Sequence, residues 1–370
     1  MIIKYDKKNR FASCFNPKTG YYARTGVLDE NGIDTGVDPF MCSFPELIDV
    51  GIMGFCKHGK SGLCVKSGVQ CYQNGLETIH PNMTLEDFER IVYECKGKVY
   101  QFALGGRGDP DQHENFKEIL ECCTSNSIVP NFTSSGLGFN SEIVDLCKKH
   151  CGAVAISWYR QPHTIRAIKM LIDAGVKTNI HYVLGNNSID EAIQRLMHDD
   201  FPEGINAVIF LLHKPVGLGK HDNVLSMTDN RVKDFFRLVE EKHRFKIGFD
   251  SCTVPGIINF TSKINPDSYD TCEGARWSMY ITADMKALPC SFDNQDLKWA
   301  YDISDDTIQN AWDSKQFEGF RKHFRKSCTL CDRRSGCMGG CPIRKEVVLC
   351  NRDVRDVFDT FDNPDWRQHG

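Results

Sequence analysis

The chain has 370 residues, of which 41% are hydrophobic and 25% are charged, so it is long enough for one large globular domain or two smaller ones. Its formal net charge of −4 argues against a nucleic-acid coat and against a polybasic membrane contact. No stretch reaches the roughly 18 apolar residues of a membrane span, and the N-terminus has no secretory signal, so we expect a cytoplasmic protein.

The cysteine content is high, with 18 in the chain. In a chain without a signal peptide the reducing cytosol disfavours disulfides, so metal binding or catalysis becomes the better explanation. Some of these cysteines lie in apolar helical patterns, where free cysteine packs as a small hydrophobic residue. We expect that role for Cys95, Cys122, Cys123, Cys147 and Cys151.

Taken in chain order, residues 1–45 are rich in Gly, Asn and Asp and are predicted to be irregular. From residue 46 onward, short apolar runs alternate with amphipathic helical patterns, which is typical of βαβ units and a parallel sheet. Six such units predict an α/β fold, a partial (β/α)6 TIM-like barrel over residues 46–249. The predicted strands are 49–55, 98–106, 127–135, 152–159, 177–185 and 206–213, and the predicted helices are 84–95, 113–123, 140–150, 163–175, 188–199 and 228–243.

After residue 249 the sequence changes character, and cysteines gather in a predicted second domain, residues 250–352, followed by a tail, 353–370. Four cysteines are spaced C-x2-C-x5-C-x3-C and a fifth follows, and four such thiolates could hold one tetrahedral zinc ion. With three cysteines upstream the set reaches eight, enough for two four-iron clusters. The eight are Cys252, Cys272, Cys290, Cys328, Cys331, Cys337, Cys341 and Cys350.

This layout resembles the SPASM extension of radical S-adenosylmethionine (radical SAM) enzymes. The first part of the family pattern reads Cys272-x12-Met285-x4-Cys290, with Met285 in place of the usual glycine, and the spacing from Cys328 to Cys341 matches without departure. The resemblance covers about residues 46–352 and implies a barrel of the radical SAM type with a C-terminal SPASM domain. It implies two auxiliary [4Fe–4S] clusters, one on Cys252, Cys272, Cys290 and Cys341 and one on Cys328, Cys331, Cys337 and Cys350.

Three further cysteines follow the first predicted strand, Cys56, Cys64 and Cys71. Their spacing is C-x7-C-x6-C, whereas the usual family spacing is C-x3-C-x2-C, and by itself this pattern also fits a zinc site or chance. Three thiolates on a [4Fe–4S] cluster leave one iron without a protein ligand, and a metal needs such an open position to bind a reactant. In the family that iron binds the amino and carboxylate groups of S-adenosyl-L-methionine (SAM), so the resemblance implies a third cluster here.

The resemblance also implies contacts to SAM at other strand ends. The segment "GGRGDP" is similar to the family's GGE motif, with Arg107 in place of the glutamate and Asp109 two positions later, although an ordinary glycine-rich turn also explains it. Hydroxyl groups after the third and fourth strands are expected near the ribose or the carboxylate of SAM, and an aromatic ring near its adenine. The expected contacts are Tyr72, Gly105, Gly106, Arg107, Asp109, Thr133, Ser135, Ser157 and Arg160.

As a function, the resemblance implies reductive cleavage of SAM to a 5′-deoxyadenosyl radical, which abstracts hydrogen from a peptide or protein substrate. A maturase of ribosomally made peptides would use it to cross-link, epimerise or excise residues, with electrons from a donor such as flavodoxin or ferredoxin. The segment before the first strand is too short for the leader-binding domain of many such maturases, so a separate leader-peptide-binding protein is an alternative. No catalytic residue is selected by the sequence.

Two other functions stay open. An anaerobic sulfatase-maturing enzyme typically has an aspartate directly after the second auxiliary cysteine, whereas here Ser291 follows Cys290 and Asp293 comes two positions later. A non-catalytic iron–sulfur or zinc-binding protein is the other possibility. The six-unit barrel argues against a simple electron carrier, because carriers need far less scaffold.

Overall fold

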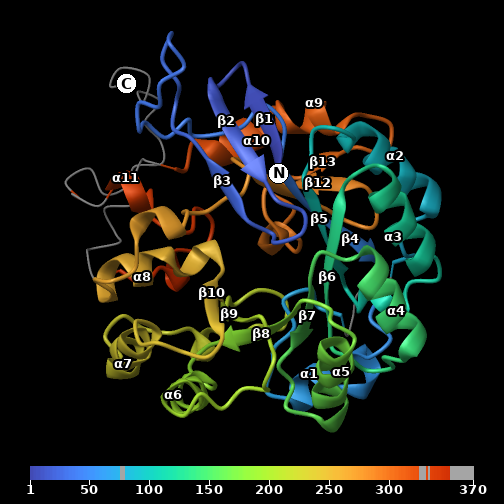
Figure 1. The fold of residues 1–370 in the computed structure, drawn as a ribbon, viewed down its shortest axis with the longest axis vertical. Helices are drawn as coiled ribbons and strands as arrows, with labels where there is room; N and C mark the ends of the chain where they lie inside the picture. The colour runs from blue at the N-terminus through green and yellow to red at the C-terminus, as the bar shows by residue number, and fades with distance from the viewer. Residues whose placement is uncertain (76–79, 325–330, 332–333, 351–370) are drawn as a thin grey trace.

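The computed structural model describes residues 1–75, 80–324, 331 and 334–350, and its centre is a ten-stranded sheet (Figure 1). The strand order is β10-β9-β8-β7-β6-β5-β4-β11-β12-β13. Neighbouring strands from β10 through β11 are parallel, whereas β12 and β13 are antiparallel additions at one edge. The strands are β4 (Leu47–Met53), β5 (Gln101–Gly106), β6 (Val129–Ser134), β7 (Val154–Ser157), β8 (Thr178–Leu184), β9 (Ala207–Leu212), β10 (Lys246–Phe249), β11 (Ser278–Ile281), β12 (Lys286–Leu288) and β13 (Tyr301–Asp302).

Helices cover the outer face of this curved sheet (Figure 1). In α2, Thr84 accepts a hydrogen bond from the Asp87 N–H as N-cap, and Phe88, Ile91, Val92 and Cys95 form the buried stripe. Each large apolar side chain buried in this way contributes about 1.5–3 kcal/mol. The longer helices are α2 (Leu85–Cys95), α3 (Phe116–Ser125), α4 (Ser141–His150), α5 (Pro162–Asp173), α6 (Ile189–Met197), α7 (Asn230–Val239) and α8 (Val254–Phe260); the shorter ones are α1 (Leu63–Lys66), α9 (Ile308–Trp312), α10 (Lys315–Arg321) and α11 (Arg334–Cys337).

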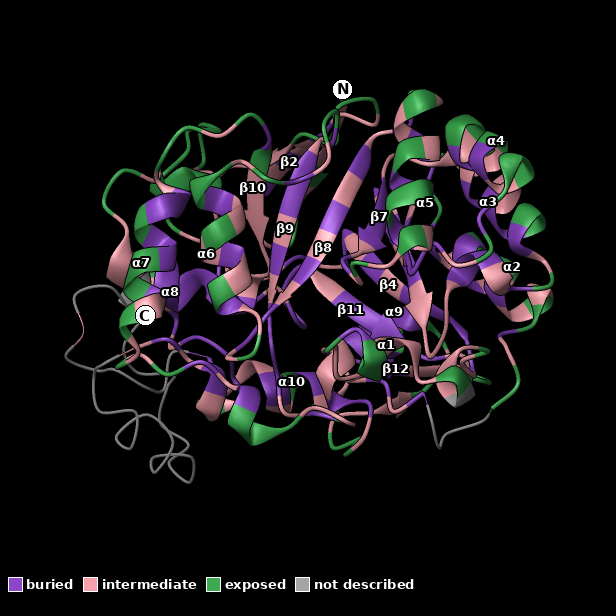
Figure 2. Ribbon diagram, turned by 90° about the horizontal axis from the view of Figure 1, so that it is seen from below, coloured by how far each residue is buried: buried purple, intermediate pink, exposed green. Residues whose placement is uncertain are grey.

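The six predicted strands are confirmed as β4–β9, and strand order follows chain order as right-handed βαβ units require. Figure 2 shows β4, β7, β8 and β9 as a mixture of buried and half-buried residues inside the helix layer. Two further parallel strands were not predicted. β10 and β11 are four residues each, and β11 pairs with β4, so the sheet continues past the expected boundary near Phe249 into the C-terminal region.

The N-terminal segment was predicted to be irregular, and this prediction is wrong for part of it. It contains a three-stranded antiparallel sheet of β1 (Ile2–Asp6), β2 (Phe11–Phe15) and β3 (Tyr22–Arg24). Its middle strand, β2, alternates buried and half-buried residues. Five residues are too few for this alternation to give a clear strand signal in the sequence. The Ser13 hydroxyl lies 2.9 Å from the Tyr100 hydroxyl. Since Tyr100 immediately precedes β5, this small sheet lies against the N-terminal ends of the barrel strands.

A buried arginine joins the N-terminal segment to the C-terminal region. The Arg276 side chain is fully buried, and its guanidinium donates to the Asp38 carboxylate at 2.7 Å and to the Phe40 carbonyl at 2.7 Å. A charge removed from water in this way is stable only while its partners stay in place. None of the helices in the described ranges is both long and apolar enough to span a bilayer.

Candidate active site

Functional side chains gather where the parallel strands end. Because β4–β9 all run in the same direction, the loops that follow them open at one end of the barrel, opposite the small N-terminal sheet. The predicted residues Gly105 and Gly106 end β5, Thr133 and Ser135 lie at the end of β6, and Ser157 ends β7. The structure therefore brings these predicted residues to the same end of the barrel.

The cysteine triad lies in the loop after β4. Cys64 is the second residue of the short helix α1, which lies between Cys56 and Cys71 in the chain. All three thiols are half-buried. The thiols are close enough for Cys71 to act electrostatically on both Cys56 and Cys64. Desolvation raises the pKa of Cys56, and it raises the pKa of Cys64 to about 12. These thiols are therefore protonated at neutral pH until a metal displaces the protons.

A tyrosine that the sequence analysis did not select also reaches this triad. The Tyr159 hydroxyl, two residues beyond β7, lies 3.1 Å from the Cys64 sulfur. Burial raises the pKa of Tyr159 well above its usual range, so the phenol stays neutral and can donate a hydrogen bond to a Cys64 thiolate. Its position between Ser157 and Arg160 was the only signal in the sequence.

Asp109 lies at the centre of a hydrogen-bond group beside the triad. Its carboxylate accepts hydrogen bonds from the Ser135 N–H at 3.0 Å and from the Ser135 hydroxyl, and it lies 3.3 Å from His58 Nε2. The adjacent Asp109 carboxylate raises the pKa of His58. Asp109 and Ser135, both predicted site residues from different strands, are thus in direct contact.

Arg107 leaves a buried polar atom without a partner. Among the described residues, no hydrogen-bond partner reaches its buried Nε. The preceding residue, Gly106, packs so closely on β4 that a Cβ there would overlap the Met53 carbonyl oxygen, while the Arg107 N–H donates to that oxygen at 2.8 Å. A buried N–H that lacks an acceptor is costly, so this atom favours an anionic ligand at the site.

Arg160 differs from the expectation that its guanidinium faces a ligand. It pairs with Glu191 at 2.5 Å and donates to the Ser67 carbonyl oxygen at 3.1 Å. A planar guanidinium with several donors satisfies both partners at once, so in this structure Arg160 connects the triad loop to α6. The sequence could not show this competition, because Glu191 is distant along the chain.

His181 is a second residue that the sequence analysis missed. It lies on β8 in register with Ser157 of β7, and its Nδ1 lies 3.1 Å from the Thr133 hydroxyl. Burial lowers the pKa of His181 to about 4, so the ring is neutral at pH 7. Thr133, Ser157 and His181 together make this part of the barrel interior polar but uncharged.

A second group of cysteines forms where the C-terminal region meets the barrel. Cys252 follows β10 and is hydrogen-bonded to Cys341, and its charge also acts on Cys272 and Cys290. The hydrogen bond with Cys341, together with burial, raises the pKa of Cys252, whereas burial raises the pKa of Cys272 and raises that of Cys290 to about 12. The fully buried Lys214, paired with Asp250, lies near these thiols and favours their ionised form.

An aromatic contact joins the two cysteine groups. The Tyr72 ring, directly after Cys71, packs on Phe292, two residues after Cys290, with ring centroids 4.6 Å apart. Lys214 Nζ lies 4.5 Å above the same Phe292 ring. Tyr72 is therefore placed between the two groups rather than isolated at the barrel mouth.

The remaining predicted ligands are described only in part. Cys328 lies outside the described residues, whereas Cys331, Cys337 and Cys350 are each half-buried. The Cys337 carbonyl accepts a hydrogen bond from Thr271 at 2.8 Å, which fixes α11 beside Cys272.

Both described groups fit an iron–sulfur cluster by their donors. The cysteines within the described ranges are all free thiols, and the two groups offer three and four of them. In the same ranges no three His, Cys, Asp or Glu side chains are arranged to hold one metal ion. A four-iron cluster spreads its thiolates over several irons, so it needs a wider arrangement than the tetrahedron of a single zinc.

Comparison with known proteins agrees with this arrangement. Residues 272–338 match the SPASM family, an iron–sulfur cluster-binding domain. No curated protein matches the chain in sequence. Among solved structures, the chain is similar to Streptococcus suis SuiB bound to S-adenosylmethionine, with a TM-score of 0.63, 18% identity, and coverage of 81% of this chain and 74% of that chain.

Two other solved structures contain peptides. SuiB bound to precursor peptide SuiA has a TM-score of 0.64 and 17% identity, over 88% of this chain and 84% of that chain. Native anSMEcpe with bound AdoMet and Cp18Cys peptide has a TM-score of 0.60 and 16% identity, over 85% of this chain and 96% of that chain. At these identities the similarity shows a shared fold.

Proposed function

We propose that this chain, which joins the barrel fold of radical SAM enzymes to a C-terminal SPASM domain, cleaves SAM reductively and abstracts hydrogen from a peptide or protein. The observation that supports the proposal most is the placement of Cys56, Cys64 and Cys71 in one loop at the C-terminal end of a parallel barrel, close enough to interact electrostatically. When bound, a [4Fe–4S] cluster supplies an open iron site and one electron, and SAM supplies the hydrogen-abstracting radical.

The chain's own residues would hold and orient SAM. The unpartnered Arg107 Nε suits a carboxylate, and Asp109, held by Ser135 and His58, suits an ammonium group. Thr133 and Ser157 remain our proposed contacts to the ribose. The Tyr159 hydroxyl would stabilise the Cys64 thiolate in the cluster-bound state.

The second group would hold an auxiliary cluster. Four cysteines, Cys252, Cys272, Cys290 and Cys341, leave no iron open, which favours electron relay over substrate binding. The contact between Tyr72 and Phe292 gives a short route between the two groups. We propose a third cluster on Cys328, Cys331, Cys337 and Cys350, and a flavodoxin or ferredoxin as electron donor in the cytoplasm.

A peptide is the substrate class best supported, because SuiB and anSMEcpe both bind peptides in structures of the same fold. Within this class we propose maturation of a ribosomally made peptide. Asp293, the aspartate closest to the sulfatase-maturase position that Ser291 occupies, accepts a hydrogen bond from the Trp299 backbone N–H at 2.8 Å and so already has a structural partner. This supports the peptide maturase over a sulfatase maturase.

The test is anaerobic reconstitution of the full chain with iron and sulfide, followed by addition of SAM and dithionite. We expect about twelve irons per chain and formation of 5′-deoxyadenosine. The triple variant of Cys56, Cys64 and Cys71 to alanine should lose about four irons and all 5′-deoxyadenosine. Cys122→Ala, which removes a half-buried thiol on α3, is the matched control and should keep both.

The result that would contradict the proposal is undiminished 5′-deoxyadenosine in the triple variant. Zinc instead of iron in the reconstituted protein would favour a non-catalytic binding protein. Short peptides encoded beside this reading frame, incubated with the active enzyme and analysed by mass spectrometry, would then identify the bond that changes.

A further inference from the structure

The edge strand β10 has backbone groups that the barrel does not use. The Lys246 N–H donates to the Asn206 carbonyl and the Asp250 N–H to the Phe210 carbonyl, both in β9 or next to it. In a parallel ladder, alternate residues bond to the same neighbour. Ile247 and Phe249 therefore direct their N–H and C=O groups away from β9, and no backbone partner for them lies in the described ranges.

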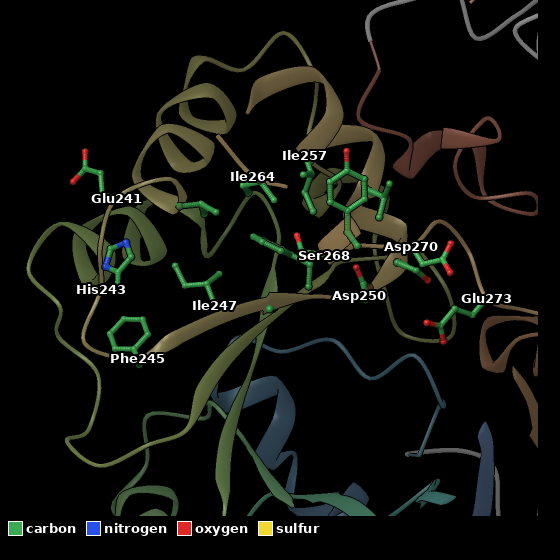
Figure 3. A pocket seen from close by; sticks show the side chains of 16 residues that line it. Glu241, His243, Phe245, Ile247, Asp250, Ile257, Ile264, Ser268, Asp270 and Glu273 are labelled. Carbon is green, nitrogen blue, oxygen red and sulfur yellow. The ribbon is translucent and has the colours of Figure 1, made fainter. Parts of the chain in front are cut away.

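A cleft of about 490 Å³ lies along this free edge (Figure 3). Its floor is β10 together with the flanking residues Phe245 and Asp250, and its other walls are Ile257 of α8 and the segment 264–273. Pairing requires room for a second strand at about 4.8 Å from the first. The cleft supplies that room beside Ile247 and Phe249.

The two faces of this edge differ in chemistry. The Phe249 ring packs near Phe235 and Phe236 of α7, with ring centroids 6.4 and 6.2 Å away, so Ile247 and Phe249 point to the apolar helix layer. On that side the cleft is lined by Val239, Val254, Ile257 and Ile264. Gly248 and Asp250 alternate to the opposite face, toward the barrel interior.

The cleft lining is acidic, with no lysine or arginine among its residues. Glu241, Asp250, Asp270 and Glu273 all contribute to it (Figure 3). Asp250 is neutralised by Lys214, and Asp270 by Arg24. Glu273 forms no ion pair within the part of the chain that is described, and it adds a carboxylate to the acidic lining at that end of the cleft, so a cation placed beside it would be stabilised.

We propose that β10 is a docking strand for the peptide substrate: an extended segment adds to its free edge, with side chains that alternate between apolar and basic. The apolar side chains face Ile257 and Ile264, and the basic ones face Glu273. Main-chain hydrogen bonds supply affinity in this mode and side-chain pockets supply selectivity. The inference rests on the proposed function only in taking the substrate to be a peptide.

The position of the cleft connects docking to the reaction. The cleft ends at Asp250 and Glu273, which adjoin the second cysteine group through Cys252 and Cys272. Glu273 also interacts electrostatically with Asp49 of β4, which is paired with Tyr280 of β11 in the sheet. A segment held on β10 would therefore continue toward the barrel interior.

The test measures binding by fluorescence anisotropy, with the reconstituted full chain and a fluorescein-labelled peptide of alternating valine and lysine. We expect it to bind at least about tenfold more tightly, or 1.4 kcal/mol, than a valine–glutamate peptide. Ile247→Pro removes the outward N–H without removing a bond to β9, and should weaken binding about tenfold. Ile247→Val keeps that N–H and is the matched control, which should bind as the parent does.

A second measurement does not depend on how the variant folds. N-methylation of one alternate set of residues in the valine–lysine peptide blocks one of its two edges, and it should abolish binding, whereas methylation of the other set should be tolerated. Equal binding by both methylated peptides, equal binding by both Ile247 variants, or no binding of the parent peptide would overturn the inference. Cleavage of SAM by the same preparation is measured separately, so docking can fail while the proposed function stands.

Discussion

Gly217 gives a quantitative test of how the turn after β9 holds the triad loop. Gly217 has φ +62°, and a Cβ there would overlap the Tyr72 carbonyl oxygen and lie 2.9 Å from the Cys71 carbonyl oxygen. The Leu218 N–H donates to that Cys71 oxygen at 2.9 Å. In Gly217→Ala, the left-handed conformation costs about 1–2 kcal/mol and the overlap with rigid backbone adds about 1–3 kcal/mol.

Gly62 provides the matched control for this change. Its φ is +64°, but nothing lies within 4 Å of a Cβ built there, so Gly62→Ala carries only the conformational cost of about 1–2 kcal/mol. We expect Gly217→Ala to lose iron from the first cluster and to bind SAM weakly, because Cys71 shifts, while Gly62→Ala keeps both. The assays are iron content per chain and SAM affinity by equilibrium dialysis. Equal iron content and equal affinity in the two variants would refute the reasoning.

Three further predictions concern charge. Arg107→Gln should weaken SAM binding about tenfold without loss of iron, whereas the exposed Arg166→Gln should not, as equilibrium dialysis would show. Burial beside Glu273 raises the pKa of Asp49 to about 7. Below its unfolded pKa near 4 this carboxyl is protonated in both states and leaves the free energy of unfolding unaffected, whereas from pH 4 to 7 it opposes folding increasingly. Asp49→Asn should therefore raise the free energy of unfolding at pH 8 by at most about 4 kcal/mol and leave it nearly unchanged at pH 4. Asp38→Ala should destabilise the fold by up to about 3–5 kcal/mol in unfolding measurements, because the buried Arg276 guanidinium then keeps only one carboxylate partner, the more distant Asp270, 3.9 Å away, and the double variant with Arg276→Met should recover part of that loss.

Periodic patterns and cysteine spacing predicted most of the barrel, because β4–β9 each carry a buried run followed by an amphipathic helix. β10 and β11 were not predicted, because four residues are too few to show a clear strand periodicity and no full βα unit follows either strand. The sequence also predicted which loops lie at the C-terminal ends of the parallel strands. The hydrogen-bond and ion-pair partners of the side chains were not predicted. Arg160 pairs with Glu191, and Tyr159 contacts Cys64, only because folding brings distant parts of the chain together.

The contact between Cys252 and Cys341 is another feature that the fold determines and the sequence pattern does not. Spacing alone does not place Cys252 beside the other three cysteines, because it lies far ahead of Cys272 in the sequence. The turn that follows β10 brings it to the other three cysteines. Parallel strands set where a loop begins, whereas long-range contacts decide which side chains meet.

The most direct test of the central claim is anomalous diffraction at the iron edge from crystals of the reconstituted protein with SAM. We expect a compact iron cluster bound by Cys56, Cys64 and Cys71, with the amino and carboxylate groups of SAM on the iron that lacks a cysteine. An anomalous map without iron at these three sulfurs, or with one zinc ion between them, would contradict it.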